Sequence, residues 1–204
     1  MKFELVRDEN GKHQIGGKVP EEFKIPENEF IANFQYLGYI DSLDPLFSWL
    51  PFKVNLIHPI YTDEYFVYLD YSNPDSPTII KPLDTASSTS AFDEIDKNSI
   101  IIFESIKVSA EEKSEIDEFK SIGLCGEPEW LQGAENPICP KSGNAMRFLC
   151  QLGSFGDIKA TFSNVEPTDG MEEYFENLNF WCDGNIYIYI EPTSKTVCYT
   201  MQNT

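Results

Sequence analysis

Residues that could act as nucleophiles or bases are few in this chain of 204 residues. It contains two histidines, His13 and His58, and five scattered cysteines at positions 125, 139, 150, 182 and 198. A nucleophilic enzyme needs a thiol or hydroxyl activated by a nearby base. Cys139 has Lys141 two positions away, and Cys150 lies in the apolar run Phe-Leu-Cys-Gln-Leu, which predicts a small buried residue. We predict no catalytic cysteine and expect the protein not to be an enzyme.

The histidines and carboxylates do not change this expectation. His13 stands in a Gly-Lys-His-Gln segment, and His58 precedes a proline in a strand-like run, which predicts a sheet or rim residue rather than a general base. Acidic pairs such as Glu21-Glu22 are explained by solvated charge, since a glycosidase needs two carboxylates placed across a cleft. No phosphate-binding glycine motif surrounds Gly16-Gly17. We therefore assign no catalytic residue and no cofactor.

Three other residues form the candidate site: Trp130, Gln132 and Gln151. Gln151 interrupts an apolar strand, and the other two stand in the Gly-Pro loop that precedes it. A buried amide must have hydrogen-bond partners. One interpretation is that the two glutamines fix loop backbone while Trp130 fills a core. The other is a patch that faces a partner or ligand, in which tryptophan supplies contact area and glutamine supplies orientation.

The elements that must position these residues are mainly strands. β-Branched and aromatic residues dominate five segments, which is the composition of half-buried sheets. In residues 186–190 isoleucine and tyrosine alternate, so each type should occupy one face of a strand. A turn at residues 192–195 should join that strand to the last one in a hairpin. The five predicted strands are residues 55–60, 65–69, 99–108, 186–190 and 196–201.

Helix signals are weaker. Ser109 as an N-cap, Glu112 three positions later and Gly123 as a terminator predict one helix, with an apolar stripe at Ile116, Phe119 and Ile122. Shorter helices are predicted at residues 91–95 and 171–176. Residues 72–90 are the most loop-like stretch and mark a candidate connection.

The two halves of the chain carry similar segments in the same order. Residues 16–20 resemble 125–128, residues 36–42 resemble 148–154, and residues 66–70 resemble 187–191, at offsets of about 109, 112 and 121. Slowly growing offsets are typical of a duplication with longer loops in the second copy; chance similarity between two aromatic β-rich stretches is the alternative. We expect a single domain over residues 1–204, with repeats at about 1–80 and 109–204.

Four motifs in the second half resemble a known family. They are Gly126-Glu-Pro-Glu-Trp-Leu-Gln132, Pro137-Ile-Cys-Pro140, Ala145-Met-Arg-Phe-Leu-Cys-Gln-Leu152 and Gly184-Asn-Ile-Tyr-Ile-Tyr189. In this order they resemble the bacterial YwqG-like family and, more distantly, the programmed-cell-death-2 and Tsr4 proteins. The clear match covers residues 123–202. The resemblance implies an α+β fold that is β-rich, with antiparallel sheets, a few short helices and an internal pseudo-twofold duplication. It implies no established activity for the bacterial branch, and a chaperone of a basic ribosomal protein for the eukaryotic one.

One departure from that family concerns metal binding. Relatives often have Cys-Pro-x-Cys, whereas this chain has Cys139-Pro-Lys-Ser142-Gly143. Structural zinc normally takes four cysteine or histidine ligands in pairs, and no other pair exists here. We predict that no metal binds and that this segment forms a tight turn.

Charge decides among classes of partner. The formal net charge is -19, and it is spread over both halves. Such a surface repels nucleic acid and anionic membranes and favours a basic protein partner; the alternative is that the charge reflects an acidic proteome background without a partner. The odd, dispersed cysteines and the charged start without an apolar segment predict a cytoplasmic protein with reduced thiols.

The sequence thus predicts a non-enzymatic, cytoplasmic protein-interaction module, chaperone-like or immunity-like, that binds a basic polypeptide. The alternative is a small-molecule-binding protein or hydrolase that uses a cleft between the two repeats. A pocket holding a histidine, a cysteine or a carboxylate pair with perturbed pKa would favour the alternative.

Overall fold

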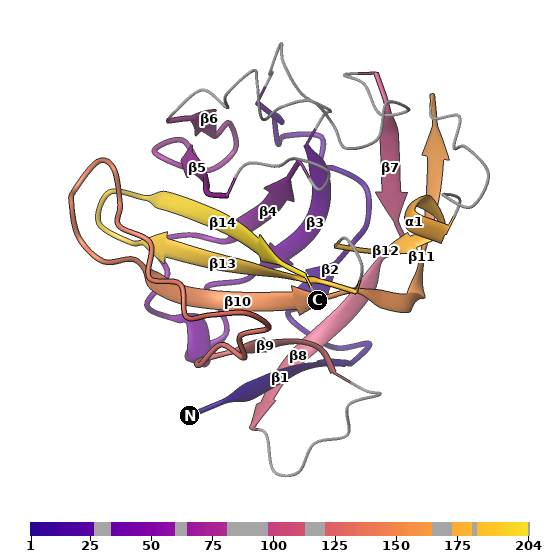
Figure 1. Cartoon of the computed structure of the whole chain (residues 1–204), viewed down its shortest axis with the longest axis horizontal. Coiled ribbons are helices and arrows are strands. Elements are labelled where there is room, and N and C mark those ends of the chain that lie inside the picture. The colour runs from indigo at the N-terminus through magenta and orange to yellow at the C-terminus, as the bar shows by residue number, and fades with distance from the viewer. Residues whose placement is uncertain are drawn as a thin grey trace.

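The computed structural model describes residues 1–26, 34–59, 65–80, 98–112, 121–164, 173–180 and 183–203. The structure is β-rich, with 49% strand and 3% helix, and its sheets are antiparallel (Figure 1). No helix among the described residues has the length and apolar character needed to cross a bilayer. The β part of the expected fold class is therefore confirmed.

Eleven strands form one sheet in the order β4-β3-β2-β8-β1-β9-β10-β13-β14-β5-β6, and three form a second in the order β12-β11-β7. Their bounds are β1 Phe3–Arg7, β2 His13–Ile15, β3 Gln35–Ile40, β4 Val54–His58, β5 Val67–Asp70, β6 Thr78–Ile79, β7 Ile100–Phe103, β8 Ile106–Glu112, β9 Ser121–Cys125, β10 Arg147–Gly153, β11 Phe155–Ser163, β12 Asn177–Leu178, β13 Asn185–Glu191 and β14 Thr196–Gln202. A 3-10 turn, η1 (Pro45–Phe47), and a short helix, α1 (Glu173–Glu176), complete the described elements. The large sheet draws on both halves of the chain.

Both faces of the large sheet are covered. Ile186, Ile188 and Ile190 of β13 point into the main core, together with residues such as Leu5 and Ile15. Tyr187 and Tyr189 point the other way, into a smaller cluster that contains Cys139, Met146 and Cys198. The predicted separation of isoleucine and tyrosine is confirmed. We call the side of the sheet that carries Tyr187 and Tyr189 the tyrosine face.

The antiparallel pair β8–β1, in which Val6 lies opposite Ser109, is the centre of eight consecutive strands of the large sheet, from β4 to β13. On one side follow β2, β3 and β4, and on the other β9, β10 and β13. The register shifts at Leu37, between β3 and β4, and at Leu149, between β10 and β13. Gly16 after β2 and Gly126 after β9 both have positive φ, 68° and 87°. The two sides thus share their strand order, bulge position and glycine position.

The third similarity, between residues 66–70 and 187–191, does not correspond to equivalent strands in the sheet. β5, which contains most of residues 66–70, pairs with β14 near one end of the sheet, whereas β13 pairs with β10. The strand that occupies the place of β13 on the other side is β4, because it pairs with β3 as β13 pairs with β10. Both β4 and β5 are short strands with buried aliphatic residues, so their composition alone does not distinguish them.

The edge of β4 is closed by tyrosine hydroxyls from the far end of the same sheet. Tyr71 Oη donates to the carbonyl oxygen of Asn55 at 2.6 Å, and the Ile57 amide donates to Tyr199 Oη at 3.2 Å. Unpaired backbone groups on an edge strand otherwise invite aggregation. These contacts bring the two ends of the curled sheet together.

The predicted helix from Ser109 to Gly123 is wrong at both ends. Residues 106–112 form β8 and residues 121–125 form β9, while residues 113–120 lie outside the described ranges. Ser109 Oγ donates to Asp8 at 2.5 Å instead of capping a helix. Long-range pairing with β1 outweighs the local capping signal, because it satisfies the backbone of the whole strand.

Most of the other predicted elements agree with the structure where it describes them. Strands 55–60, 186–190 and 196–201 are confirmed by β4, β13 and β14, with the predicted hairpin between the last two. The strand at residues 99–108 is divided into β7 and β8. The helix at 171–176 is confirmed over Glu173–Glu176, and the one at 91–95 lies outside the described residues.

Candidate functional site

The Gly126 loop, residues 126–146, carries two of the predicted site residues. It begins at Gly126, whose φ is 87°. A Cβ built there would lie 2.2 Å from the carbonyl oxygen of Met1, so only glycine fits this close backbone approach. The loop then runs to the start of β10, at the left in Figure 1. Its course places Trp130 on the tyrosine face.

Trp130 stacks on two tyrosines of β13. Its ring centroid lies 4.7 Å from that of Tyr187 at an interplanar angle of 24°, and 6.4 Å from that of Tyr189 at 15°. Trp130 is half-buried, and it packs against the smaller cluster. One side of the indole therefore covers the sheet, which matches the core-filling part of the first interpretation.

Both predicted glutamines hold main chain in this structure. Gln151 is buried; its Oε1 accepts from the Glu129 amide at 2.6 Å, and its Nε2 donates to the Glu129 carbonyl at 3.4 Å. Gln132 is exposed, and its Nε2 donates to the Asn203 carbonyl at 2.8 Å. Trp130, Gln132 and Gln151 thus belong to one assembly, in which the amides fix the loop and the strand end beside it.

A third glutamine, Gln202 at the end of β14, binds the backbone of more loop residues than Gln132 or Gln151 does. Its Oε1 accepts from the amides of Leu131 and Gln132, both at 3.1 Å, and its Nε2 donates to the Gly133 carbonyl at 2.6 Å. Only 2% of Gln202 is exposed, so these bonds satisfy a buried amide. Sequence reasoning missed it, because a polar residue at a strand end carries no local signal.

A row of five residues crosses the tyrosine face and ends in two glutamates; we call it the acidic row. Directly opposed residues on five successive strands share a face of a sheet. Tyr187 of β13 lies opposite Gln151 of β10, and the row continues through Leu124 of β9 to Glu4 of β1 and Glu111 of β8. Glu4 and Glu111 are therefore like charges placed directly opposite each other, an arrangement that destabilises a sheet. Glu129 lies at the other end of the row, over Gln151, and pairs with Lys2 at 2.9 Å.

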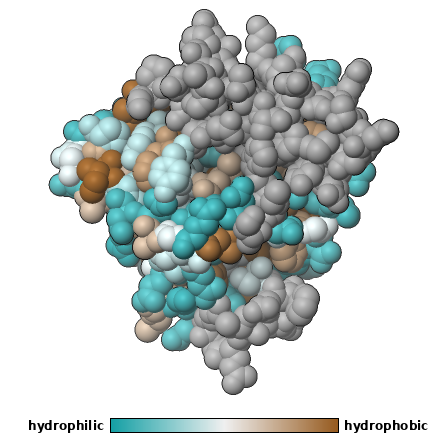
Figure 2. All heavy atoms as spheres, in the orientation of Figure 1, coloured by the Kyte–Doolittle hydropathy of each residue, from teal (hydrophilic) through white to brown (hydrophobic). Residues whose placement is uncertain are grey.

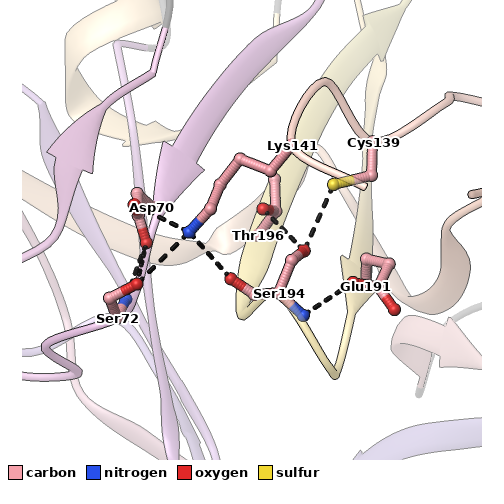
Figure 3. A network of polar contacts seen from close by, with 7 residues as sticks. All are labelled: Asp70, Ser72, Cys139, Lys141, Glu191, Ser194 and Thr196. Carbon is pink, nitrogen blue, oxygen red and sulfur yellow. Dashed lines mark hydrogen bonds and ion pairs between the residues drawn. The ribbon is translucent and has the colours of Figure 1, made fainter. Parts of the chain in front are cut away.

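Two five-residue turns of similar sequence meet at the far end of the Gly126 loop (Figure 3). One is Cys139-Pro-Lys-Ser142-Gly143, and the other is Glu191-Pro-Thr-Ser194-Lys195. Gly143 and Lys195 both have positive φ, 74° and 56°. In each turn the side chain of the first residue accepts a hydrogen bond from the serine amide. The Ser142 amide donates to the Cys139 sulfur, and the Ser194 amide donates to Glu191 Oε2 at 2.7 Å. The predicted tight turn at Ser142 is confirmed.

Lys141 joins these turns to β5. Its Nζ donates to Asp70 Oδ2 at 2.8 Å, to Ser72 Oγ at 3.2 Å and to the Ser194 carbonyl at 3.0 Å, as Figure 3 shows. Burial alone would raise the pKa of Asp70, but hydrogen bonds from Lys141 and Ser72 outweigh it and lower the pKa. Lys141, the cation two positions from Cys139 in the sequence, therefore pairs with the Asp70 carboxylate.

Cys139 differs from the other described cysteines in acidity. Its side chain has no exposed surface, which by itself raises the pKa, yet hydrogen bonds from Ser142, Ser194 and Thr196 lower the pKa to about 7. Ser194 Oγ lies 3.2 Å from its sulfur. Burial raises the pKa of Cys125, Cys150 and Cys198. Hydrogen bonds to the charged form therefore let the Cys139 thiol ionise near neutral pH although its side chain has no exposed surface.

This acidity can be measured. We expect the ultraviolet absorbance of thiolate to rise with a midpoint near pH 7 in the wild-type protein and this step to vanish in Cys139→Ala. Ser194→Ala should move the midpoint upward, because it removes a hydrogen bond to the charged form. A step that persists in Cys139→Ala would assign it to another thiol.

The histidines do not join a site. His13 Nδ1 accepts from the Asp41 amide at 3.0 Å, and its Nε2 lies 3.4 Å from Asp44 Oδ2. Burial lowers the pKa of His13 in spite of both carboxylates. His58 is buried in β4 and packs against Tyr199, with ring centroids 5.5 Å apart. No group of three or more histidines, cysteines or carboxylates suited to a metal occurs among the residues that the structure describes.

One pocket lies beside the first half of the sheet rather than between the halves. It is lined by Gly17–Val19, Ile25–Pro26, Phe34–Tyr36 and Ser99–Ile102. None of these lining residues is a histidine, a cysteine or a carboxylate. The feature that would favour a hydrolase is therefore missing from the described lining. Elsewhere, the apolar surface visible in Figure 2 forms small separate areas among hydrophilic ones.

Comparisons with known proteins do not identify the chain. No family model matches it, and no curated protein and no solved structure is significantly similar to it.

Proposed function

We propose that this protein is a non-enzymatic, cytoplasmic interaction module that binds a basic polypeptide through its tyrosine face. The observation that carries the proposal is the acidic row, in which Glu4 and Glu111 oppose each other on the same face of the sheet that Trp130 covers at β13. Carboxylates gathered on one face attract a cationic partner and steer its approach. The half-buried indole supplies the apolar contact that interfaces usually contain at their centre.

The overall charge supports the same proposal. A formal charge of -19 exceeds the magnitude of about 2–8 that keeps a small domain soluble. Exposed carboxylates occur throughout the described elements, among them Glu9, Glu104 and Glu176. This wide distribution steers a cation from a distance, while the acidic row supplies the local contact.

The family and the duplication are part of the proposal. We propose that the chain is a distant relative of the YwqG-like proteins, with the α+β class and the internal duplication which that resemblance implies. Support comes from the matching strand order, bulges and glycines on the two sides of β8–β1. In this arrangement β1 pairs with β9 and β8 pairs with β2, so each half lends its first strand to the other.

A charge-neutralising double variant tests the function. A lysine-rich peptide serves as the probe, and its association rate is measured by stopped flow between about 50 and 300 mM salt. We expect Glu4→Gln/Glu111→Gln to slow association about threefold or more at low salt, with a smaller change in dissociation, because rim charges act mainly on encounter. The difference should shrink as salt increases.

The control removes the same charge elsewhere. Glu9 and Glu176 are exposed and lie in a turn and in α1, so Glu9→Gln/Glu176→Gln also changes the net charge by two. Equal effects of the two variants would contradict a localised site, and absence of salt-dependent binding would contradict the proposed function. Urea unfolding should show that Glu4→Gln/Glu111→Gln unfolds cooperatively, so that a slower association reports the lost charges rather than a loss of folding.

A further inference from the structure

The pocket beside β7 has the size and lining of a small-molecule site. Its volume is about 420 Å³, within the range of roughly 300–1,000 Å³ that is common for ligand pockets. Its walls are the start of β3 (Phe34–Tyr36), Ser99 with the first three residues of β7 (Ile100–Ile102), and Gly17–Val19 with Ile25–Pro26. Isoleucine, valine, proline and aromatic side chains make up most of this lining, so the interior favours an apolar group.

Apolar side chains remain exposed at this pocket. Val19 is 38% exposed and Ile100 is 46% exposed, although both line the cavity. Burial of such a side chain against a ligand removes apolar surface from water on both partners. A ligand that fills the pocket therefore gains contacts that the described residues do not make among themselves.

Lys18 supplies a charge at the same pocket. It is exposed and is the charged residue of the described lining. Among the described residues it forms no ion pair or hydrogen bond through its ammonium, unlike Lys2, Lys141 and Lys159. A lysine keeps its ammonium in water while its methylenes cover apolar surface. Lys18 is therefore the residue of the described lining that could meet an anionic head group at the solvent side of the pocket.

The backbone beside Lys18 is held firmly. The Gly17 amide donates to the Phe103 carbonyl at 2.9 Å, and Gln14 Nε2 donates to the Gly16 carbonyl at 3.0 Å. Gly17 has a φ of 96°, and a Cβ there would lie 2.4 Å from Gln14 Nε2. These contacts fix the direction in which the chain enters Lys18 and Val19, so the cation is presented from a defined position.

We propose that this pocket binds an amphipathic monoanion, with an aliphatic chain among the apolar side chains and a carboxylate at Lys18. The proposal is independent of the peptide-binding function, which uses the tyrosine face. The net negative charge of the protein repels any anion. At physiological salt, however, the electrostatic effect of a charge is largely screened beyond about 8 Å. The local ammonium then decides which head group is accepted.

Decanoate and decan-1-ol are the probes, titrated calorimetrically at physiological salt below their aggregation limits. Shortening the chain from decanoate to octanoate should weaken binding about fourfold per methylene, the fold-change for about 0.8 kcal/mol of burial. Lys18→Gln should weaken decanoate binding about fivefold or more and leave decan-1-ol unchanged, because only the carboxylate meets the ammonium.

Two further variants make the outcome decisive. Lys159→Gln removes an exposed lysine of β11, whose ammonium contacts Asn177, and should leave both ligands unaffected. Ile100→Ser, at an exposed position, should weaken both ligands with little effect on folding. Equal losses in Lys18→Gln and Lys159→Gln would overturn the head-group assignment. Absence of binding, or binding that does not depend on chain length or on Ile100, would overturn the site.

Discussion

Gly38→Ala is expected to destabilise the protein by about 3–5 kcal/mol, more than most single substitutions do. Gly38 lies in β3 directly after the bulge at Leu37, with a φ of 115°. L-residues rarely adopt this conformation, and forcing one into it costs roughly 1–3 kcal/mol. In addition, a Cβ would lie 2.0 Å from the carbonyl oxygen of Gln14, which belongs to the neighbouring strand. Relief of this clash requires β2 and β3 to separate.

Urea unfolding of the two proteins measures the difference. Gly156→Ala in β11 is the matched control, because its new Cβ meets nothing within 4 Å and its φ is not positive. That variant should remain within about 0.5 kcal/mol of the wild type. A similar small effect for Gly38→Ala would mean that β2 and β3 do not approach each other as closely as the structure indicates.

The sequence predicts the strands whose pattern is local. The alternation of residues 186–190 requires two buried faces, and the hairpin to β14 follows from the turn at 192–195. It does not predict the centre of the sheet, because β1 and β8 are about a hundred residues apart in the chain and pair through their backbones. Ser109 illustrates this limit: its capping pattern is genuine, but the strand partner is invisible in the local sequence.

The candidate site shows the same division. Trp130, Gln132 and Gln151 could be predicted, since an aromatic residue in a Gly-Pro loop and an amide in an apolar strand are unusual where they stand. Gln202 could not be predicted, although it fixes three residues of the loop backbone. The opposition of Glu4 and Glu111 depends on register, which one sequence does not disclose.

His58 should make the protein sensitive to acid. Complete burial lowers its pKa from the ordinary value of 6.5 to about 3. The folded protein therefore keeps His58 neutral at a pH where the unfolded chain already binds a proton. Stability from this residue is fully present above about pH 6.5 and is lost as the pH falls toward 3, in total about 4–5 kcal/mol at 1.36 kcal/mol per pKa unit. Among the residues that the structure describes, neither ring nitrogen has a hydrogen-bond partner that would compensate for the charge.

His58→Leu isolates this contribution from that of the carboxylates. Asp70 and Glu191 have lowered pKa values because of their hydrogen bonds, so they also lose stability in acid, but they do so equally in both proteins. We expect the free energy of unfolding, measured in urea from pH 7 to pH 4, to fall less steeply for His58→Leu than for the wild type. At pH 7 the variant should be at least as stable, because leucine removes two unsatisfied polar atoms from the core. Parallel pH profiles would show that His58 reaches water or a proton acceptor in solution. That result would contradict the burial of His58 in β4 against Tyr199, and with it the closure of the sheet at this edge.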